Sequence, residues 1–354
     1  SDDKKFDEFE QPIGWTGYTW NKSLFPEPDR FLQWLKEQRI KPTLNLHPAS
    51  GIAPYEEQYA EFAKAMNFDT TAKKNIPFEV ADKQFMTNLF DIVLNPMQQK
   101  GVAFWWLDWQ QWPYSKKVAG LSNTWWLNYS FFTHMERQKN QRPLLYHRWG
   151  GLGNHRYQIG FSGDAAISWK SLDFQPYFTS TASNVLYGYW SHDLGGHMFA
   201  NVPEDQKKID PELYTRWMQY GVFSPIFRTH SSKDPRLMKE IWNFTGSYFD
   251  ALYDAIHLRY ALAPYIYTQA RETYDTGVSL CRPMYYDYPK DENAYTFKNE
   301  YMFGNDMLIV PVTTPAVNDL STVTVWLPAG NDWYEWSTGT LLKGGQTIER
   351  KFLI

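Results

Sequence analysis

Short apolar runs alternate along the chain with segments in which apolar residues recur every three to four positions. The apolar runs lie at 41–49, 101–108, 142–149, 158–164, 184–196 and 221–230. The segments with helical periodicity lie at 26–38, 55–66, 85–92, 125–138 and 211–221. Continuous apolar strands separated by helices are typical of a parallel sheet whose two faces are both covered.

These repeated strand–helix units predict a (β/α)8 barrel, because polar residues collect just after the strand ends. A doubly wound sheet is the alternative, but no glycine-rich phosphate loop follows any of the strands. Six strands cannot close an eight-stranded barrel, and open parallel edges invite aggregation. We therefore expect that the chain lacks about two N-terminal strands and that an upstream N-terminal segment of the same protein completes the barrel.

The character of the sequence changes after a long helical stretch at 248–274, which contains Pro264. From about Gly277, short apolar runs alternate with Gly, Pro and Asn-Asp breaks, which is typical of a small all-β domain. The predicted domains are a barrel domain at 1–275 and a C-terminal β-sandwich domain at 276–354.

Aromatic residues make up 18% of the chain, with 17 Trp, 24 Tyr and 23 Phe. Composition leaves two explanations open, a thick aromatic core or aromatic side chains that pack on sugar rings. The net charge of -4 provides no basic field for nucleic acid, and no apolar run approaches the length of a membrane span. Neither a nucleic-acid partner nor a membrane is predicted. The single cysteine, Cys281, excludes an internal disulfide.

Chemically active side chains gather at the predicted strand ends, where barrel enzymes place their active sites. They are His47, Asp108, Arg148, Asp164, Asp193 and His230. A metal held by His192, Asp193 and His197 was weighed, but no His-Glu-x-x-His helix or second cluster supports it. A serine nucleophile would need a Gly-x-Ser-x-Gly turn, which the sequence lacks. Paired carboxylate chemistry of the kind that cleaves glycosidic bonds remains, with no metal and no cofactor.

Asp108 carries the strongest signal, because it ends the apolar run GVAFWWLD and is flanked by tryptophans. A buried carboxylate is costly unless it is paired. The residue is therefore either a structural cap of the next turn or a reactive carboxylate in an aromatic pocket.

Seven segments resemble, in order, the motifs of glycoside hydrolase family 31. FWWLDW (104–109) resembles the family's nucleophile motif, and GFSGDAAISW (160–169) resembles its acid/base motif. The other five are SHDLGG (191–196), RWMQYGVFSPIFRTHS (216–231), RPMYYDYP (282–289), FGNDMLIVPV (303–312) and LPAGNDWYEW (327–336). The resemblance covers nearly the whole chain.

The resemblance implies a retaining α-glycosidase acting on an oligosaccharide or α-glycoside, with α-glucosidase as the first expectation. An α-galactosidase, an α-xylosidase or a catalytically silent carbohydrate-binding relative are the alternatives. Asp108 would be the nucleophile and Asp164 the general acid/base, with their carboxyl groups about 5–6 Å apart. The expected substrate-binding residues are Trp106, Arg148, Phe161, Asp193, His197, His230 and His47. Arg148 is expected to keep Asp108 ionised, and Phe161 and Trp169 are expected to shield Asp164 from water.

Two departures from the family pattern concern residues expected beside the sugar. Trp109, Gln110 and Gln111 follow the nucleophile where the family commonly has Met-Asn-Glu. His197 stands where an aromatic residue usually follows the Gly-Gly turn. The family's early-strand aspartate and its N-terminal β-sandwich are expected upstream of this sequence.

Overall fold

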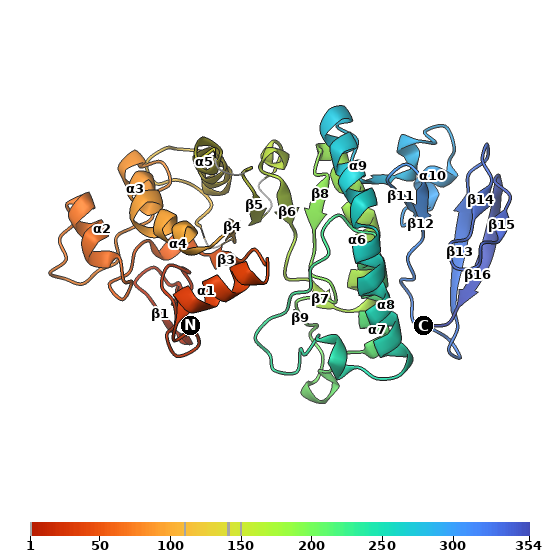
Figure 1. Ribbon diagram of the computed structural model, residues 1–354, viewed down its shortest axis with the longest axis horizontal. Helices are drawn as coiled ribbons and strands as arrows, with labels where there is room; N and C mark the ends of the chain where they lie inside the picture. Colours follow the sequence, from red (N-terminus) through yellow and green to blue (C-terminus); the bar gives the residue numbers. More distant parts are fainter. Residues whose placement is uncertain (1, 110, 140–141, 149–150) are drawn as a thin grey trace. The chain divides into compact units, whose positions relative to one another are not determined.

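The computed structural model describes residues 2–109, 111–139, 142–148 and 151–354, with the side chains of 2–4 left aside (Figure 1). The chain divides into two compact units, residues 1–160 and 161–354. Each unit is described by itself below. Among the described residues, none of the helices combines the length and the apolar character needed to cross a membrane.

The first unit carries three parallel strands whose connections are helical. Its elements are β1 (Asp2–Phe6), β2 (Pro12–Ile13), α1 (Pro28–Glu37), β3 (Thr43–Leu46), η1 (Pro48–Ser50), α2 (Tyr59–Met66), α3 (Lys83–Asn88), the π-helix η2 (Leu89–Leu94), α4 (Asn95–Lys100), β4 (Phe104–Leu107), α5 (Asn123–Arg137), β5 (Leu145–Arg148), η3 (Asn154–Tyr157) and β6 (Ile159–Phe161). The boundary between the units falls within β6.

Two helices of this unit, α3 and α5, start where a side chain satisfies a free N–H group. Asp82 accepts a hydrogen bond from the Phe85 N–H at the start of α3, and Ser122 accepts one from the Trp125 N–H at the start of α5. Asn67 ends α2 in the left-handed conformation, which asparagine tolerates better than most residues. Local sequence therefore sets these boundaries.

The strands β3, β4 and β5 pair in parallel with matched ends. Leu46 is opposite Leu107, and Leu107 is opposite His147. Leu46, Leu107 and Leu145 are buried in one cluster with Trp105 and apolar residues of the surrounding helices. This burial fixes the register, because a shift by one residue would turn these leucines to the other face of the sheet.

The second unit combines further strands and helices of the barrel type with an antiparallel C-terminal part. Its elements are β7 (Ala166–Ile167), α6 (Trp169–Thr181), η4 (Ala182–Val185), β8 (Tyr189–Ser191), β9 (Met198–Phe199), η5 (Glu204–Gln206), α7 (Pro211–Val222), η6 (Ile241–Asn243), α8 (Ser247–Ala261), α9 (Ala263–Thr276), β10 (Cys281–Pro283), η7 (Met284–Tyr286), α10 (Asn293–Thr296), β11 (Tyr301–Phe303), β12 (Met307–Ile309), β13 (Ser321–Leu327), β14 (Trp333–Tyr334), β15 (Leu341–Leu342) and β16 (Gln346–Phe352).

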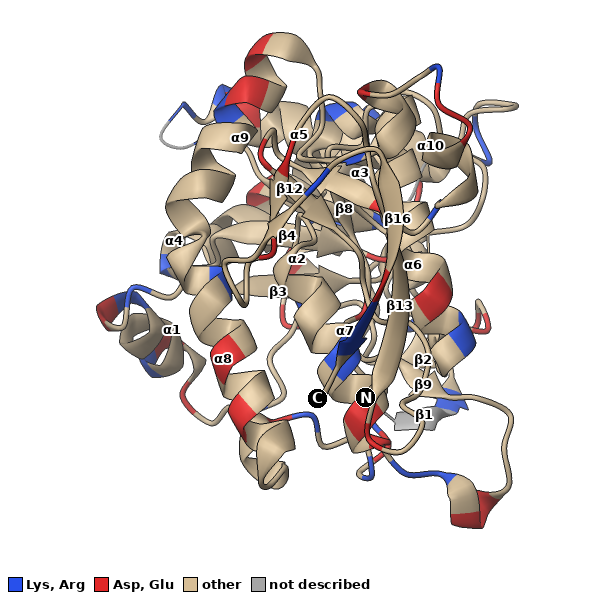
Figure 2. Ribbon diagram, turned by 90° about the vertical axis from the view of Figure 1, so that its right-hand side faces the viewer, with Lys and Arg blue, Asp and Glu red and all other residues tan. Residues whose placement is uncertain are grey.

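The C-terminal part of this unit consists mainly of β-strands, as its sequence predicted, and they pair antiparallel. The strands form three sheets ordered β10-β11-β12, β13-β16 and β14-β15. Arg216 of α7 ties this part to the helices, since its guanidinium donates to Ser321 Oγ at 2.9 Å and to the Leu353 carbonyl at 3.0 Å. The charged residues of β16, visible in Figure 2, include Arg350, which pairs with Glu335. The predicted boundary at 275/276 stays a prediction.

One expected strand of this unit is wrong, and the expected helical stretch is confirmed with a break. The run 221–230 is not a strand, because α7 extends to Val222 and only Thr229 makes an isolated bridge, to Leu194. Pro225 cannot donate a ladder hydrogen bond, and Arg259 donates to the carbonyl of Pro225 as well as to those of its neighbours. The predicted helix at 248–274 is two helices that meet at Leu262, just before Pro264.

Several predicted strands are shorter than their apolar runs. Residues 184–188 contribute to η4 and a turn, so that β8 begins only at Tyr189. The run 142–149 contributes β5 from Leu145 to Arg148, and Trp149 lies outside the described residues. An apolar run marks a buried segment more reliably than it marks strand ends.

Glu300, just before β11, is a buried carboxyl group in the C-terminal part. It is 3% exposed, and its Oε1 accepts a hydrogen bond from the Trp326 N–H at 2.7 Å. Burial raises the pKa of Glu300 from 4.5 to about 8. The group is therefore protonated at neutral pH in the folded protein.

We expect the Glu300→Gln variant to lose less stability than wild type as the pH rises. A carboxyl group with a raised folded-state pKa favours folding fully below about 4.5 and loses that contribution as the pH rises through about 8. The loss is at most about 1.4 kcal/mol per pH unit. Urea unfolding of wild type and of Glu300→Gln at pH 5, 7 and 9 measures the free energy of unfolding at each pH. The exposed Glu349→Gln is the control, and parallel pH slopes for wild type and Glu300→Gln would contradict the prediction.

Candidate active site

Three strand ends of the first unit bring polar side chains into one row. In the register of the sheet, His47 follows β3, Asp108 follows β4 and Arg148 ends β5 at neighbouring positions. The Asp108 N–H continues the ladder by donating to the Leu46 carbonyl at 3.1 Å. The register that buries the leucines therefore also sets these polar residues side by side.

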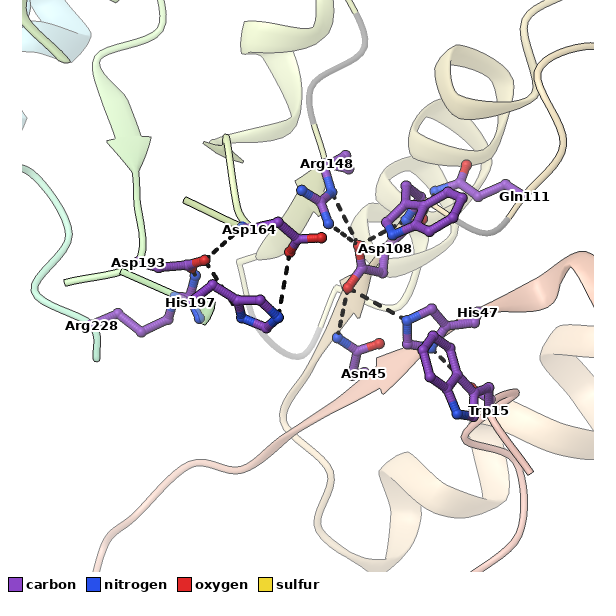
Figure 3. A network of polar contacts seen from close by, with 11 residues as sticks. Trp15, Asn45, His47, Asp108, Gln111, Arg148, Asp164, Asp193, His197 and Arg228 are labelled. Carbon is purple, nitrogen blue, oxygen red and sulfur yellow. Dashed lines mark hydrogen bonds and ion pairs between the residues drawn. The ribbon is translucent and has the colours of Figure 1, made fainter. Parts of the chain in front are cut away.

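The Asp108 carboxylate is buried and accepts hydrogen bonds at both oxygens (Figure 3). Its Oδ1 accepts from Arg148 Nε at 3.0 Å, from Arg148 Nη2 at 2.8 Å and from the Trp109 N–H at 2.8 Å. Its Oδ2 accepts from Asn45 Nδ2 at 3.2 Å and lies 3.5 Å from His47 Nε2. The carboxylate is thus surrounded by cations and N–H donors.

These contacts decide the ionisation of Asp108. Burial opposes the charged form, but the His47 contact, the Arg148 charge and the Asn45 hydrogen bond outweigh it and hold the pKa of Asp108 well below its usual range. The expected effect of Arg148 on Asp108 is therefore present in the structure, and His47 and Asn45 add to it. Asp108 is therefore ionised at neutral pH.

His47 was expected to contact substrate, but the structure places both of its ring nitrogens against protein atoms. Its Nδ1 lies 2.9 Å from the Trp15 carbonyl oxygen, and its Nε2 faces Asp108. The Trp15 ring packs against the imidazole with centroids 5.2 Å apart. Asn45 was missed by sequence reasoning, although its position two residues before His47 puts both side chains on one face of the strand.

Of the three residues that follow Asp108, Gln111 differs from the expectation that it lies beside a sugar. Gln111 is fully buried and its amide donates to the Asp108 carbonyl, while the Gln111 carbonyl accepts from Asn123 Nδ2 at 2.8 Å. Gln111 therefore supports the backbone behind the carboxylate. Trp109 is 57% exposed, and Gln110 lies outside the described residues.

The tryptophans around Asp108 have different environments. Trp105 is buried in the core, whereas Trp106 is half-buried and meets the Tyr146 ring edge to face at a centroid distance of 5.5 Å. Trp112 donates from Nε1 to the Ala49 carbonyl at 3.0 Å. The role of Trp106 as a sugar contact stays a prediction.

The second unit carries a separate polar group centred on Asp193 (Figure 3). The Asp193 side chain is fully buried, accepts from Arg228 Nη2 at Oδ1 and accepts the Asp164 N–H at Oδ2 over 2.7 Å. Burial opposes its ionisation, but Arg228, with His230 and His197, lowers the pKa of Asp193. Asp193 therefore holds the backbone that carries Asp164.

Asp164 was expected to be shielded from water by Phe161 and Trp169, and this is wrong. Its side chain is 42% exposed, while Phe161 is buried with the Arg228 guanidinium over its ring at 5.8 Å. Asp164 has a positive φ of 54°, which is unusual for a residue other than glycine. The Asp193 bond to its N–H helps to hold this conformation, because the surroundings must support such a strained residue.

His197 links the two carboxylates of this group. Its Nε2 lies 3.9 Å from Asp164 Oδ1 and its Nδ1 lies 3.8 Å from Asp193 Oδ2. The His230 ring lies beside the His197 ring, with centroids 4.8 Å apart. The sequence thus identified side chains that do come together, and Arg228, which it had not assigned, completes the group.

Lys239 is a buried residue that sequence reasoning missed. Its ammonium donates to the carbonyls of Leu194 at 3.3 Å, of His230 at 2.6 Å and of Gly196. Burial lowers the pKa of Lys239 to about 8. The side chain fastens the Gly-Gly turn to the segment that carries His230, and no sequence pattern marks it.

The metal site weighed from the sequence does not form with the residues proposed for it. His192 is fully buried, its ring packs against Trp217 and Tyr220, and burial lowers its pKa to about 3. Among the residues that the structure describes, Asp164, Asp193 and His197 bring ligand atoms within 4.8 Å of one another. The Arg228 guanidinium already balances the negative charge of Asp193.

Comparison with known protein families gives the same family as the resemblance of the seven sequence motifs. The model of the glycosyl hydrolases family 31 TIM-barrel domain matches residues 3–269, and the model of the glycosyl hydrolase family 31 C-terminal domain matches residues 277–353. The chain belongs to glycoside hydrolase family 31. Its fold is therefore the family's TIM barrel followed by an all-β C-terminal domain, as the sequence predicted.

Family 31 relatives carry several enzyme names. The chain is 29% identical over 96% of its length to an alpha-xylosidase of Saccharolobus solfataricus and 26% identical over 94% to neutral alpha-glucosidase C of Mus musculus. Alpha-glucosidase 2 of Bacillus thermoamyloliquefaciens is 34% identical over 58% of the chain. The chain spans 47%, 39% and 24% of these three proteins, respectively.

Solved structures agree on the fold. A xylosidase from Aspergillus niger aligns with 96% of the chain and 57% of its own, with a TM-score of 0.79 and 20% identity. A Flavobacterium johnsoniae family 31 dextranase in complex with glucose covers 96% of the chain and 45% of its own, with a TM-score of 0.78 and 23% identity.

The Gly-Gly turn of this family 31 chain packs too closely for any side chain at its second glycine. A Cβ on Gly196, whose φ is 76°, would lie 2.8 Å from Ile167 Cγ1 and 3.0 Å from Ile167 Cα. Gly277 has a φ of 78° and no neighbour within 4 Å of an added Cβ. Alanine substitutions at the two glycines therefore separate the free-energy cost of the positive φ from the free-energy cost of the close contact.

We expect Gly277→Ala to cost about 1 kcal/mol of stability, the penalty of a left-handed alanine. Gly196→Ala should cost about 1–3 kcal/mol more, because the contact with Ile167 cannot relax freely. Urea unfolding measures both, and turnover should fall only in Gly196→Ala, since His197 follows that glycine. Equal losses of unfolding free energy in Gly196→Ala and Gly277→Ala would show that the Gly-Gly turn adapts to a side chain.

Proposed function

We propose that the protein is a retaining α-glycosidase that hydrolyses terminal, non-reducing α-linked sugars, with α-glucosidase as the first assignment. One observation carries the proposal: a buried carboxylate, Asp108, is kept ionised by Arg148 and His47 at the end of a strand in a family 31 barrel domain. A carboxylate held charged away from water suits the nucleophile of a glycosidase.

In the first step, Asp108 attacks the anomeric carbon while Asp164 protonates the leaving oxygen. Oδ2 is the attacking oxygen, because Oδ1 already accepts three hydrogen bonds whereas the donors at Oδ2 lie at 3.2 and 3.5 Å. The exposure of Asp164 supports its role, since a proton donor must exchange protons with solvent between turnovers. The leaving group departs with the proton, and a glycosyl ester remains on Asp108.

In the second step, Asp164 accepts a proton from water, and the water attacks the anomeric carbon from the face that the leaving group left. The ester bond to Asp108 breaks, and its carboxylate regains its charge beside Arg148 and His47. Two inversions give a product with the α-configuration of the substrate. The sequence requires the two carboxyl groups to flank one glycosidic bond, about 5–6 Å apart.

The remaining predicted site residues have roles that follow from their chemistry. Trp106 offers a flat apolar face for a sugar ring. His197 and His230 can hydrogen-bond sugar hydroxyls at the side of Asp164, while Phe161 and Asp193 act through Arg228 and the Asp164 backbone. An upstream segment of the same protein supplies the rest of the barrel in this proposal.

An α-xylosidase is the second candidate, and α-galactosidase activity is a further alternative. The relative from Saccharolobus solfataricus that matches 96% of the chain is named an alpha-xylosidase. A catalytically silent carbohydrate-binding relative is the alternative outside enzymes. The presence of both Asp108 and Asp164 favours the enzyme, since a silent relative could lose either.

Aryl α-glycosides of glucose, xylose and galactose should separate these candidates when assayed with the full-length protein. We expect the highest kcat/KM for the glucoside, and proton NMR of the first-formed sugar should show the α-anomer. A β-anomer as first product would contradict the retaining mechanism. Sugar binding without turnover on all three substrates would support the silent relative.

Replacing the two aspartates separately should produce different kinetic defects. Asp108→Ala should abolish turnover in a folded protein. Asp164→Ala should slow unactivated disaccharides about 10²–10⁴-fold, because proton transfer contributes that much, and should slow activated aryl glycosides far less. Azide should partly rescue the second variant by trapping the glycosyl-enzyme as an α-glycosyl azide. Wild-type rates of both variants on a disaccharide would refute the assignment.

A further inference from the structure

The loop 14–19 of the first unit is fastened at several points to the segment after β3. The Gly14 N–H donates to Tyr55 Oη at 2.9 Å, and the His47 N–H donates to the Thr16 carbonyl at 3.3 Å. Gly17 has a φ of 80°, and a Cβ there would lie 2.3 Å from the Asn45 carbonyl oxygen. The loop therefore runs directly against the strand end that carries Asn45 and His47.

The main anchor of this loop is Glu56, a buried residue to which the proposed reaction assigns no role. Glu56 is 4% exposed, and each of its carboxylate oxygens accepts one hydroxyl hydrogen bond, Oε1 from Thr16 and Oε2 from Thr19. The Glu57 N–H in turn donates to Thr19 Oγ1 at 3.1 Å. Taking a carboxyl group out of water costs stability. A surface loop could be held without this cost, so the burial of Glu56 needs a further explanation.

The loop delivers one group to the site, the Trp15 carbonyl. This oxygen can only accept, so the His47 Nδ1 that lies 2.9 Å from it carries a proton. Asp108 Oδ2 also only accepts, so the contact with His47 Nε2 is favourable when that nitrogen carries a proton too. Held between these two acceptors, the His47 ring has its Nε2 aimed at the carboxylate.

We propose that Glu56 is a positioning residue of this reaction: through Thr16 and the loop 14–19, it fixes the Trp15 carbonyl that aims His47 Nε2 at Oδ2 of the nucleophile. The inference rests on the nucleophilic role proposed above for Asp108. It also assigns His47 to the nucleophile, where the sequence had suggested a sugar contact. His47 then stabilises the carboxylate as it leaves the anomeric carbon in the second step.

The chain offers a matched set of variants. Glu56→Gln keeps the shape but replaces one of the two accepting oxygens with an amide nitrogen, which cannot accept a hydroxyl hydrogen bond. Thr16→Val removes one hydroxyl donor should the first variant fold poorly. Glu57→Gln is the control, because Glu57 is adjacent but its carboxylate is half-exposed near Lys22. His47→Gln gives the full effect of losing the imidazole ring.

The acid limb of the pH profile of kcat/KM should move by a different amount in each variant. The charged groups that face Asp108 in this unit are Arg148 and His47, and loss of the His47 charge removes part of what favours the carboxylate. His47→Gln should therefore move the acid limb upward by about one pH unit. Glu56→Gln should move it in the same direction by less, and Glu57→Gln should leave it unchanged. KM for the aryl glycoside should change less than twofold in Glu56→Gln.

A double variant decides whether Glu56 acts through His47. The Glu56→Gln, His47→Gln double variant should match His47→Gln alone, because both substitutions interrupt one path. A further upward shift of the acid limb in the double variant would overturn the proposal. A lower melting temperature of Glu56→Gln with an unchanged acid limb would show that Glu56 is only a structural anchor. That result would also overturn the proposal.

Nitrogen NMR of ¹⁵N-histidine-labelled full-length protein tests the same inference without catalysis. The His47 signals are identified by their loss in His47→Gln. Nδ1 of His47 should carry a proton in wild type and in Glu57→Gln, because it faces the Trp15 carbonyl, and Glu56→Gln should shift the His47 ring-nitrogen signals. A His47 whose Nδ1 lacks a proton in wild type would refute the inference. A protein that hydrolyses none of the glycosides but passes this test would refute only the proposed function.

Discussion

The fold of the first unit depends on keeping one carboxylate charged where water is largely excluded. An unpaired buried carboxylate would cost several kcal/mol, so its donors must be placed by the main chain before the site can exist. The parallel register meets this requirement, since it sets His47, Asp108 and Arg148 at neighbouring strand ends. The leucines one position earlier fix the register through their burial. Core packing and site electrostatics are thus two results of one alignment.

The second unit holds its exposed carboxylate, Asp164, by a different arrangement of side chains. Asp164 is exposed and adopts a positive φ, so neither burial nor a regular strand holds it. The buried Asp193 supports it through its N–H, and Arg228 balances the charge that this support introduces. Lys239 then satisfies carbonyls of the turn that follows Asp193. Each side chain of the group compensates for a cost that another one creates.

The sequence predicted most of the site residues because strand ends can be recognised from where an apolar run stops. Asp108, Arg148 and His47 all follow from that rule, and the antiparallel C-terminal part follows from its short runs and turn residues. The rule failed at 221–230, where an apolar composition hides the end of α7 and Pro225 prevents strand pairing. Exposure was also misjudged, since Phe161 is near Asp164 in sequence but points into the core.

What could not be predicted depends on contacts between distant segments. Glu56 meets Thr16 across 40 positions, and Lys239 meets Gly196 across 43. No local periodicity encodes such pairs, because a buried charged residue looks like a surface residue until the fold shows what faces it. Gln111 illustrates the same limit: its position after the nucleophile suggested a sugar contact, and the structure turns it toward the backbone.

The two oxygens of Asp108 are held unequally, and this inequality suits a group that must both attack and leave. Strong donors at an attacking oxygen stabilise its charge and thereby weaken it as a nucleophile, but they improve it as a leaving group. Arg148 and the Trp109 N–H hold Oδ1 and fix the orientation of the carboxylate. His47, at 3.5 Å from Oδ2, is a weaker partner in the resting state, and its interaction strengthens when charge returns to that oxygen. A donor held slightly too far for a strong hydrogen bond therefore favours departure without greatly hindering attack, provided that the loop behind it does not move.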